Sequence, residues 1–144
     1  MKRHLIILFS SINLILSAQE LIVTVDKNPA IVGEQIFVQY KINDKGNNFI
    51  SPNFNGLKVL SGPNPSTQSS YSFINGKSES TITTTYSYYV KANKEGEYVI
   101  TPASITVNGK EINSTSLNLK VLKSNNINTK TVSYTHLRAH ETLL

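Results

Sequence analysis

The sequence is poor in the residues that most often carry chemistry. Its 144 residues include no cysteine, no tryptophan, one methionine and three histidines. Without cysteine, the chain has no disulfide, thiolate metal site or cysteine nucleophile, and it lacks the cysteine that a bacterial lipoprotein anchor requires. The histidines, His4, His136 and His140, all lie near the chain ends, so residues 19–130 contain no imidazole. That segment therefore offers no histidine for a serine–histidine arrangement or a metal site.

Charge is also sparse and is not concentrated in one place. Charged residues make up 16% of the chain, and the formal net charge is +5. Within residues 19–130, eleven lysines and eight carboxylates leave a net charge of +3, and no block of one sign occurs. Because nucleic-acid binding depends on a concentrated basic stripe, we expect a solvated surface and no nucleic-acid partner.

The first eighteen residues have the three parts of a secretory signal peptide. Lys2 and Arg3 provide a positive start, an apolar run follows over residues 5–16, and Ser17 and Ala18 provide small residues before a cleavage site. The run is short for a permanent anchor, which needs about 20 apolar residues. We therefore expect residues 1–18 to be a signal peptide and the mature chain to be exported.

The segment that follows has the alternation of β-strands. It is rich in Val, Ile, Thr and Tyr, which favour strands. Ile36, Val38, Tyr40 and Ile42 recur at every second position, which predicts a strand with one face in a core. A similar alternation over residues 117–121 predicts the last strand.

Turn signals separate these strands. The Asn-Gly pairs at residues 75–76 and 108–109 predict two tight hairpins, because both turn positions favour positive φ. A short strand near residues 57–60 is expected to end at the Gly-Pro pair 62–63 and at Pro65.

Seven or eight short strands without a helix predict an all-β fold. We expect an immunoglobulin-like antiparallel β-sandwich over residues 19–123, with a partly open β-barrel as the alternative. The polar residues 124–131 are expected to form a linker.

The candidate functional residues are aromatic and acidic. Four tyrosines are candidates for an aromatic face that binds a protein partner, although cross-strand pairing explains the same pattern; they are Tyr71, Tyr86, Tyr88 and Tyr89. The carboxylates lie mostly in predicted turns, as solvated charges do, and their spacing leaves a glycosidase-like pair open; they are Glu20, Asp26, Glu34, Asp44, Glu79, Glu95, Glu97 and Glu111. No phosphate-binding, EF-hand or nucleophile-elbow motif occurs.

Taken together, these patterns predict a protein that is not an enzyme, with no catalytic, cofactor-binding or metal-binding residue. The alternative is a carbohydrate-binding or hydrolytic β-sandwich that uses the tyrosines and a pair of carboxylates.

The order of several motifs resembles one protein family. The string "FNGLKVLSGP" is followed by "ING" and then by "TYSYYVKANKEGEYVITPASITVNGK". Together with the flanking strands, these motifs resemble the N-terminal domain of the BatD family, the oxygen-tolerance (aerotolerance) proteins, over residues 19–121. The resemblance implies an exported, non-catalytic scaffold module on the periplasmic side of the inner membrane. It also implies further β domains, a C-terminal membrane anchor, which we expect to be missing from this fragment, and envelope partners of the von Willebrand factor A type with a MoxR-type ATPase.

The last residues differ abruptly from the rest. His136 and His140 are four apart and would share one face of a helix, as metal ligands do. Translated back into codons, however, "VSYTHLRAHET" resembles a transposase-type adaptor used in sequencing libraries. We therefore expect residues 132–144 to be adaptor read-through on a shortened reading frame and not a metal site.

Overall fold

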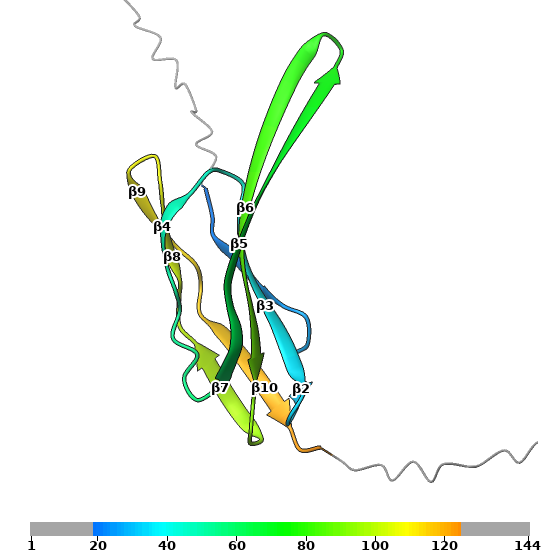
Figure 1. Ribbon diagram of the computed structural model, residues 1–144, viewed down its shortest axis with the longest axis vertical. Helices are drawn as coiled ribbons and strands as arrows, with labels where there is room; N and C mark the ends of the chain where they lie inside the picture. The colour runs from blue at the N-terminus through cyan, green and yellow to red at the C-terminus, as the bar shows by residue number, and fades with distance from the viewer. Residues whose placement is uncertain (1–18, 125–144) are drawn as a thin grey trace, which may run out of the picture.

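The computed structural model describes residues 19–124, which form a β structure without helices (Figure 1). The strands are β1 (Ile22–Val25), β2 (Ala30–Ile31), β3 (Gln35–Ile42), β4 (Asn47–Ile50), β5 (Lys58–Ile74), β6 (Lys77–Lys91), β7 (Gly96–Ile100), β8 (Ser104–Val107), β9 (Lys110–Asn113) and β10 (Leu117–Leu122). Within the described part of the chain, no helix has the length and apolar character needed to cross a membrane.

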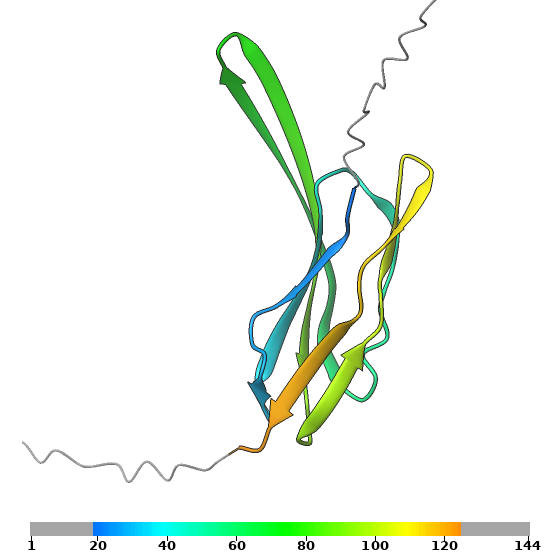
Figure 2. The ribbon, with the colours of Figure 1, turned by 180° about the vertical axis from the view of Figure 1, so that it is seen from behind.

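The strands form two layers. One layer is a four-stranded sheet in the order β1-β3-β6-β5. The other consists of two three-stranded sheets, β2-β10-β7 and β4-β8-β9, which lie end to end in both views (Figures 1 and 2). All the strand pairs are antiparallel except β2 with β10. The predicted β-sandwich is therefore confirmed, and over residues 19–124 the sheets do not close into the alternative barrel.

The core lies between the two layers and follows the predicted alternation. Ile36, Val38, Tyr40 and Ile42 of β3 are each at most 1% exposed, which confirms the predicted core face of this strand. From the opposite layer, buried apolar residues of β7, β8, β9 and β10 complete the same core; they are Ile100, Ile105, Val107, Ile112, Leu119 and Val121.

Both predicted hairpins form. Asn75 and Gly76 have φ values of 52° and 76°, and Asn108 and Gly109 have 51° and 77°. These angles suit asparagine and glycine far better than other residues, so the turns follow directly from the local sequence.

The predicted end of a strand at the Gly-Pro pair 62–63 is wrong. β5 continues through this segment and through Pro65 for 17 residues, with register shifts between Val59 and Ser61 and between Ser61 and Asn64. Proline is compatible with this position because β5 is an edge strand. At the register shifts, the residues of β5 also do not all have to donate a backbone hydrogen bond to β6. Residues 19–124 form ten strands instead of the predicted seven or eight, because a strand as short as β2 forms only through tertiary contacts.

The remaining segment predictions concern the chain ends. The predicted signal peptide (residues 1–18) and adaptor tail (residues 132–144) lie outside the described residues, and only Ser124 of the predicted linker lies within them.

Candidate functional site

The most conspicuous feature outside the core is the far part of the β5–β6 hairpin. β3 pairs with β6 only as far as Thr84, opposite Ile42. Beyond this point, residues 68–83 pair only with one another and extend past the other strands of the sandwich (Figures 1 and 2). We call residues 68–83 the distal hairpin.

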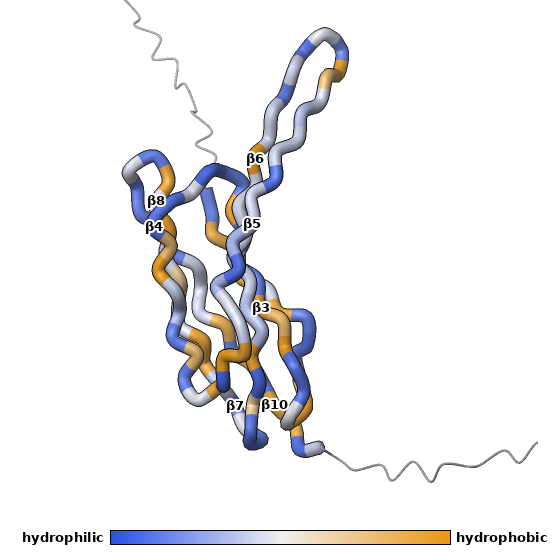
Figure 3. The backbone as a smooth tube through the Cα atoms, viewed as in Figure 1, coloured by the Kyte–Doolittle hydropathy of each residue, from blue (hydrophilic) through white to orange (hydrophobic). Residues whose placement is uncertain are grey.

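The strand register gives the distal hairpin two different faces. Tyr71 pairs with Ser80 and Phe73 with Ser78, so both aromatic side chains lie on the face that is continuous with Thr84 and Tyr88. The other face carries serine, threonine, glutamine and Glu79, together with Ile74 beside the turn. In the hydropathy colouring, the hairpin is mostly polar with an apolar segment close to its tip (Figure 3).

The apolar side chains near the tip are strongly exposed. Tyr71 is 70% exposed, Phe73 69% and Ile74 65%. Tyr71 and Phe73 are exposed because no second layer covers the sheet here, although their face is the core face further along β6, and Ile74 lies on the opposite face beside the turn. Single exposed apolar residues are ordinary on protein surfaces, but a cluster at the end of a projection is typical of an interaction site.

Closer to the sandwich, the same face of β6 is covered by an aromatic cluster. The Tyr86 and Phe49 rings stack with centroids 3.9 Å apart and planes 5° from parallel. The Tyr88 ring lies 4.9 Å from Phe54 and 6.1 Å from Tyr40, with edge-on contacts to both. Such pairs favour offset or edge-to-face geometry and contribute to packing, so these rings serve the core.

The structure does not bring the four predicted tyrosines onto one exposed face, and this correction has a simple cause. Tyr88 is 2% exposed and Tyr86 is half-buried, because their side of the sheet faces the second layer. Tyr89 has the opposite parity, packs against Phe37 with ring centroids 5.1 Å apart and is 37% exposed. Only Tyr71 belongs to the distal hairpin.

Sequence reasoning missed Phe73 and Ile74 as members of this surface. The signal was present, because both residues come just before the Asn-Gly turn and Phe73 alternates with Tyr71. The missing information was how far the second layer extends, which local alternation does not encode.

The buried tyrosine hydroxyls do not provide acid–base chemistry at neutral pH. The Tyr88 hydroxyl donates a hydrogen bond of 2.7 Å to the Ser51 hydroxyl. Burial raises the pKa of Tyr88, although this hydrogen bond partly opposes the increase. Burial also raises the pKa of Tyr40, and the nearby Tyr88 adds to the effect. Within residues 19–124, the Tyr40 hydroxyl has no hydrogen-bond partner.

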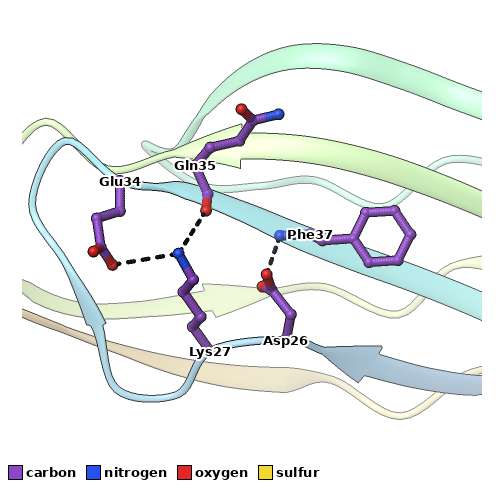
Figure 4. A network of polar contacts seen from close by, with 5 residues as sticks. All are labelled: Asp26, Lys27, Glu34, Gln35 and Phe37. Atoms are coloured by element: carbon purple, nitrogen blue, oxygen red, sulfur yellow. Dashed lines mark hydrogen bonds and ion pairs between the residues drawn. The ribbon is translucent and has the colours of Figure 1, made fainter.

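Two of the candidate carboxylates, Asp26 and Glu34, make contacts between the end of β1 and the start of β3 (Figure 4). Asp26 accepts a 2.8 Å hydrogen bond from the Phe37 backbone N–H, which ties the end of β1 to β3. Glu34 lies 3.7 Å from the ammonium group of Lys27, which also donates to the Gln35 carbonyl at 3.5 Å. An exposed ion pair such as that of Lys27 with Glu34 contributes about 0–1 kcal/mol, so it adds little to the stability of the fold.

Metal-ligating chemistry has no obvious location in the described part of the chain. Over residues 19–124, no group of three or more histidine, cysteine, aspartate or glutamate side chains has the proximity to hold a metal ion. The surface with the clearest chemical character is therefore the aromatic face and tip of the distal hairpin.

Comparison with known proteins identifies the domain. The family model described as the BatD DUF11-like domain matches residues 23–121, which contain nearly the whole sandwich. A search of the curated proteins finds no match.

Proposed function

The chain belongs to the BatD family, and from this premise we propose that its sandwich is an exported, non-catalytic module that binds other proteins of the cell envelope. The observation that carries the proposal is the distal hairpin. Its aromatic and aliphatic side chains, Tyr71, Phe73 and Ile74, are 65–70% exposed at the end of a projection. A partner that covers them would remove apolar surface from water, which is the main favourable term in protein association.

The composition of this surface suits protein recognition. Tyrosine and phenylalanine are enriched at protein interfaces, where they supply large contact areas with few rotatable bonds. The distal hairpin also contributes little to the fold, because an isolated two-stranded ribbon is at best marginally stable. Its apolar side chains therefore support binding more than they support the core.

The proposed partners are those that the family resemblance implies, namely membrane proteins of the von Willebrand factor A type. In this proposal the domain acts on the periplasmic side of the inner membrane, and no cofactor or metal takes part. The carbohydrate-binding or hydrolytic alternative has weaker support, because the carboxylates Asp26 and Glu34 already serve the contacts that join β1 to β3.

The test measures binding of the full chain to the purified soluble domain of such a von Willebrand factor A-type protein. A Tyr71→Ser, Phe73→Ser double variant should bind about 10–100-fold more weakly, as expected when interface anchors are removed. The matched control is Val99→Ser on β7, because Val99 is also an apolar strand residue and is 48% exposed. The control should bind within about twofold of the wild type.

Thermal melting of all three proteins shows whether the substitutions leave the fold intact. Equal melting temperatures with a selective loss in the double variant support the proposal. Absence of binding by the wild type, or equal losses in the double variant and Val99→Ser, would overturn it.

A further inference from the structure

The outer edge of β5 is the longest free strand edge in the described structure. β5 is the last strand in the order β1-β3-β6-β5, and all 17 of its residues are exposed. Within residues 19–124, no strand pairs with its outer side. Unpaired backbone N–H and C=O groups along such an edge form a template for another strand.

The two halves of this edge differ. The half near the sandwich contains Pro63 and Pro65 and two register shifts, features that prevent further strand pairing. The other half, residues 66–74, contains no proline and no charged residue, and its register with β6 is regular over the whole stretch. We call residues 66–74 the open edge.

The other edges in the described sheets are better protected. β1, β4 and β9 have four residues each, and β2 has two. β9 also carries Lys110 and Glu111, and β7 carries Glu97. On the opposite side of the distal hairpin, residues 77–83 of β6 carry Lys77 and Glu79. Short length and charge are the usual means by which proteins avoid unwanted strand pairing, and the open edge has neither.

The hairpin geometry determines which backbone groups are available. In a two-residue hairpin the residues that flank the turn, here Ile74 and Lys77, exchange backbone hydrogen bonds. From this pair onward, hydrogen-bonded and non-hydrogen-bonded residue pairs alternate along β5 and β6. The odd-numbered residues of the open edge therefore direct their N–H and C=O groups away from β6; they are Thr67, Ser69, Tyr71 and Phe73.

From these observations we infer that the open edge binds an extended segment of a partner protein as an additional β-strand. This inference rests on the proposed function and specifies its mode of binding. Main-chain hydrogen bonds to the odd-numbered residues supply the affinity, as in other cases of strand addition. The partner segment has apolar side chains at alternate positions, because one of its faces lies beside Tyr71 and Phe73 and the other beside serine and glutamine.

A second copy of the chain fits this edge less well than a partner does. Two copies of β5 related by a two-fold axis pair odd residues with odd residues, since the axis keeps the sheet faces aligned. Pairing all of residues 66–74 places Tyr71 opposite Ser69 and Phe73 opposite Thr67. Pairing Tyr71 with the same residue of the second copy overlaps residues 68–74, and pairing Tyr71 with Phe73 overlaps only residues 70–74. A second copy therefore loses strand pairs as it gains directly opposed aromatic side chains, whereas an alternating apolar segment can pair along the whole open edge and contact both rings.

The test uses two serine-to-proline variants that differ only in the edge they block. Ser69→Pro removes an N–H from the open edge. Ser80→Pro removes an N–H from the opposite edge of the distal hairpin, because Ser80 pairs with Tyr71 at a position where neither residue bonds to the other strand. Both serines lie on the aromatic face and both are exposed, so the variants are closely matched.

Each full-length variant is titrated with the same soluble von Willebrand factor A-type domain that tests the proposed function. Ser69→Pro should weaken binding by about tenfold or more, and Ser80→Pro should bind within about threefold of the wild type. Light scattering on the free chain reports its oligomeric state in parallel, and the expected result is a monomer.

The outcomes separate the two proposals. Wild-type binding that Ser69→Pro leaves intact would overturn strand addition while the proposed function stands. A dimer that Ser69→Pro dissociates would replace the partner segment with a second copy and overturn the inference. No binding by the wild type would overturn the proposed function and strand addition together.

Discussion

Gly62 lies where β5 bends against β6, and its replacement by alanine should destabilise the domain through a close backbone contact. Its φ is 119°, a value that other residues rarely adopt. An added Cβ would lie 2.6 Å from Tyr88 Cδ1, 2.7 Å from the Ser87 carbonyl oxygen and 3.0 Å from Tyr88 Cα. Two of these neighbours are backbone atoms of a central strand, so they cannot rotate away.

The size of the effect follows from two contributions. Overpacking of this kind costs about 1–3 kcal/mol. Residues held in a backbone region favourable only to glycine cost about 1–3 kcal/mol more. We therefore expect Gly62→Ala to lower the free energy of unfolding by about 2–6 kcal/mol, which lowers the urea midpoint by about 1–3 M at a slope of about 2 kcal/mol per molar.

Gly33→Ala is the matched control. Gly33 also has a positive φ, 87°, but nothing lies within 4 Å of the added Cβ. Gly33→Ala should therefore lower the free energy of unfolding only through backbone strain, by about 1–2 kcal/mol. Urea unfolding followed by circular dichroism measures both variants. If Gly62→Ala proves no less stable than Gly33→Ala, the close approach of β5 to β6 is not as described.

Three further predictions concern the core. Tyr88→Phe should lower the free energy of unfolding by about 0.5–1.5 kcal/mol because it loses the bond to Ser51, whereas Tyr40→Phe should be neutral or stabilising; urea unfolding compares them, and a larger loss in Tyr40→Phe would contradict this. Burial raises the pKa of Tyr40 above its usual value of about 10, because the folded domain accommodates the neutral phenol and not the phenolate. The contribution of Tyr40 to the free energy of unfolding is therefore complete below pH about 10 and is lost as the pH rises further. Unfolding measured from pH about 8 to about 11 should show this decline, with a shallower slope in Tyr40→Phe, and equal slopes would refute it. Val38→Asp places an unpaired charge at a position that is 0% exposed, so cooperative melting should disappear, and an unchanged melting curve would show that this face is not core.

The sequence predicted those parts of the fold that depend on neighbouring residues. Alternation identified the core face of β3 through Val38 and Tyr40, and the Asn-Gly pairs identified both hairpins with their positive φ values. The predicted strand end at Pro63 was wrong because a proline can lie within a strand that forms the edge of a sheet. Whether a strand lies at an edge depends on the order of all the strands in the sheet, which local sequence does not encode.

The candidate site shows the same division. Tyr71 and Tyr88 belong to the same face of the hairpin, yet one is 70% exposed and the other 2%. The difference arises because the second layer covers Tyr88 and ends before Tyr71, and this length is a property of β4, β8 and β9. Local alternation places Tyr71 and Tyr88 on one face and Tyr89 on the other, but it does not show which of these residues are accessible.

Amide hydrogen exchange along β5, measured by NMR with the chain free and bound to the von Willebrand factor A-type domain, tests the central claim most directly. Binding by strand addition should slow exchange at the outward-facing amides of Thr67, Ser69, Tyr71 and Phe73. Side-chain docking alone would leave these amides exposed to water. Slower exchange confined to these positions is the predicted result, and unchanged exchange along β5 in the saturated complex would contradict the account.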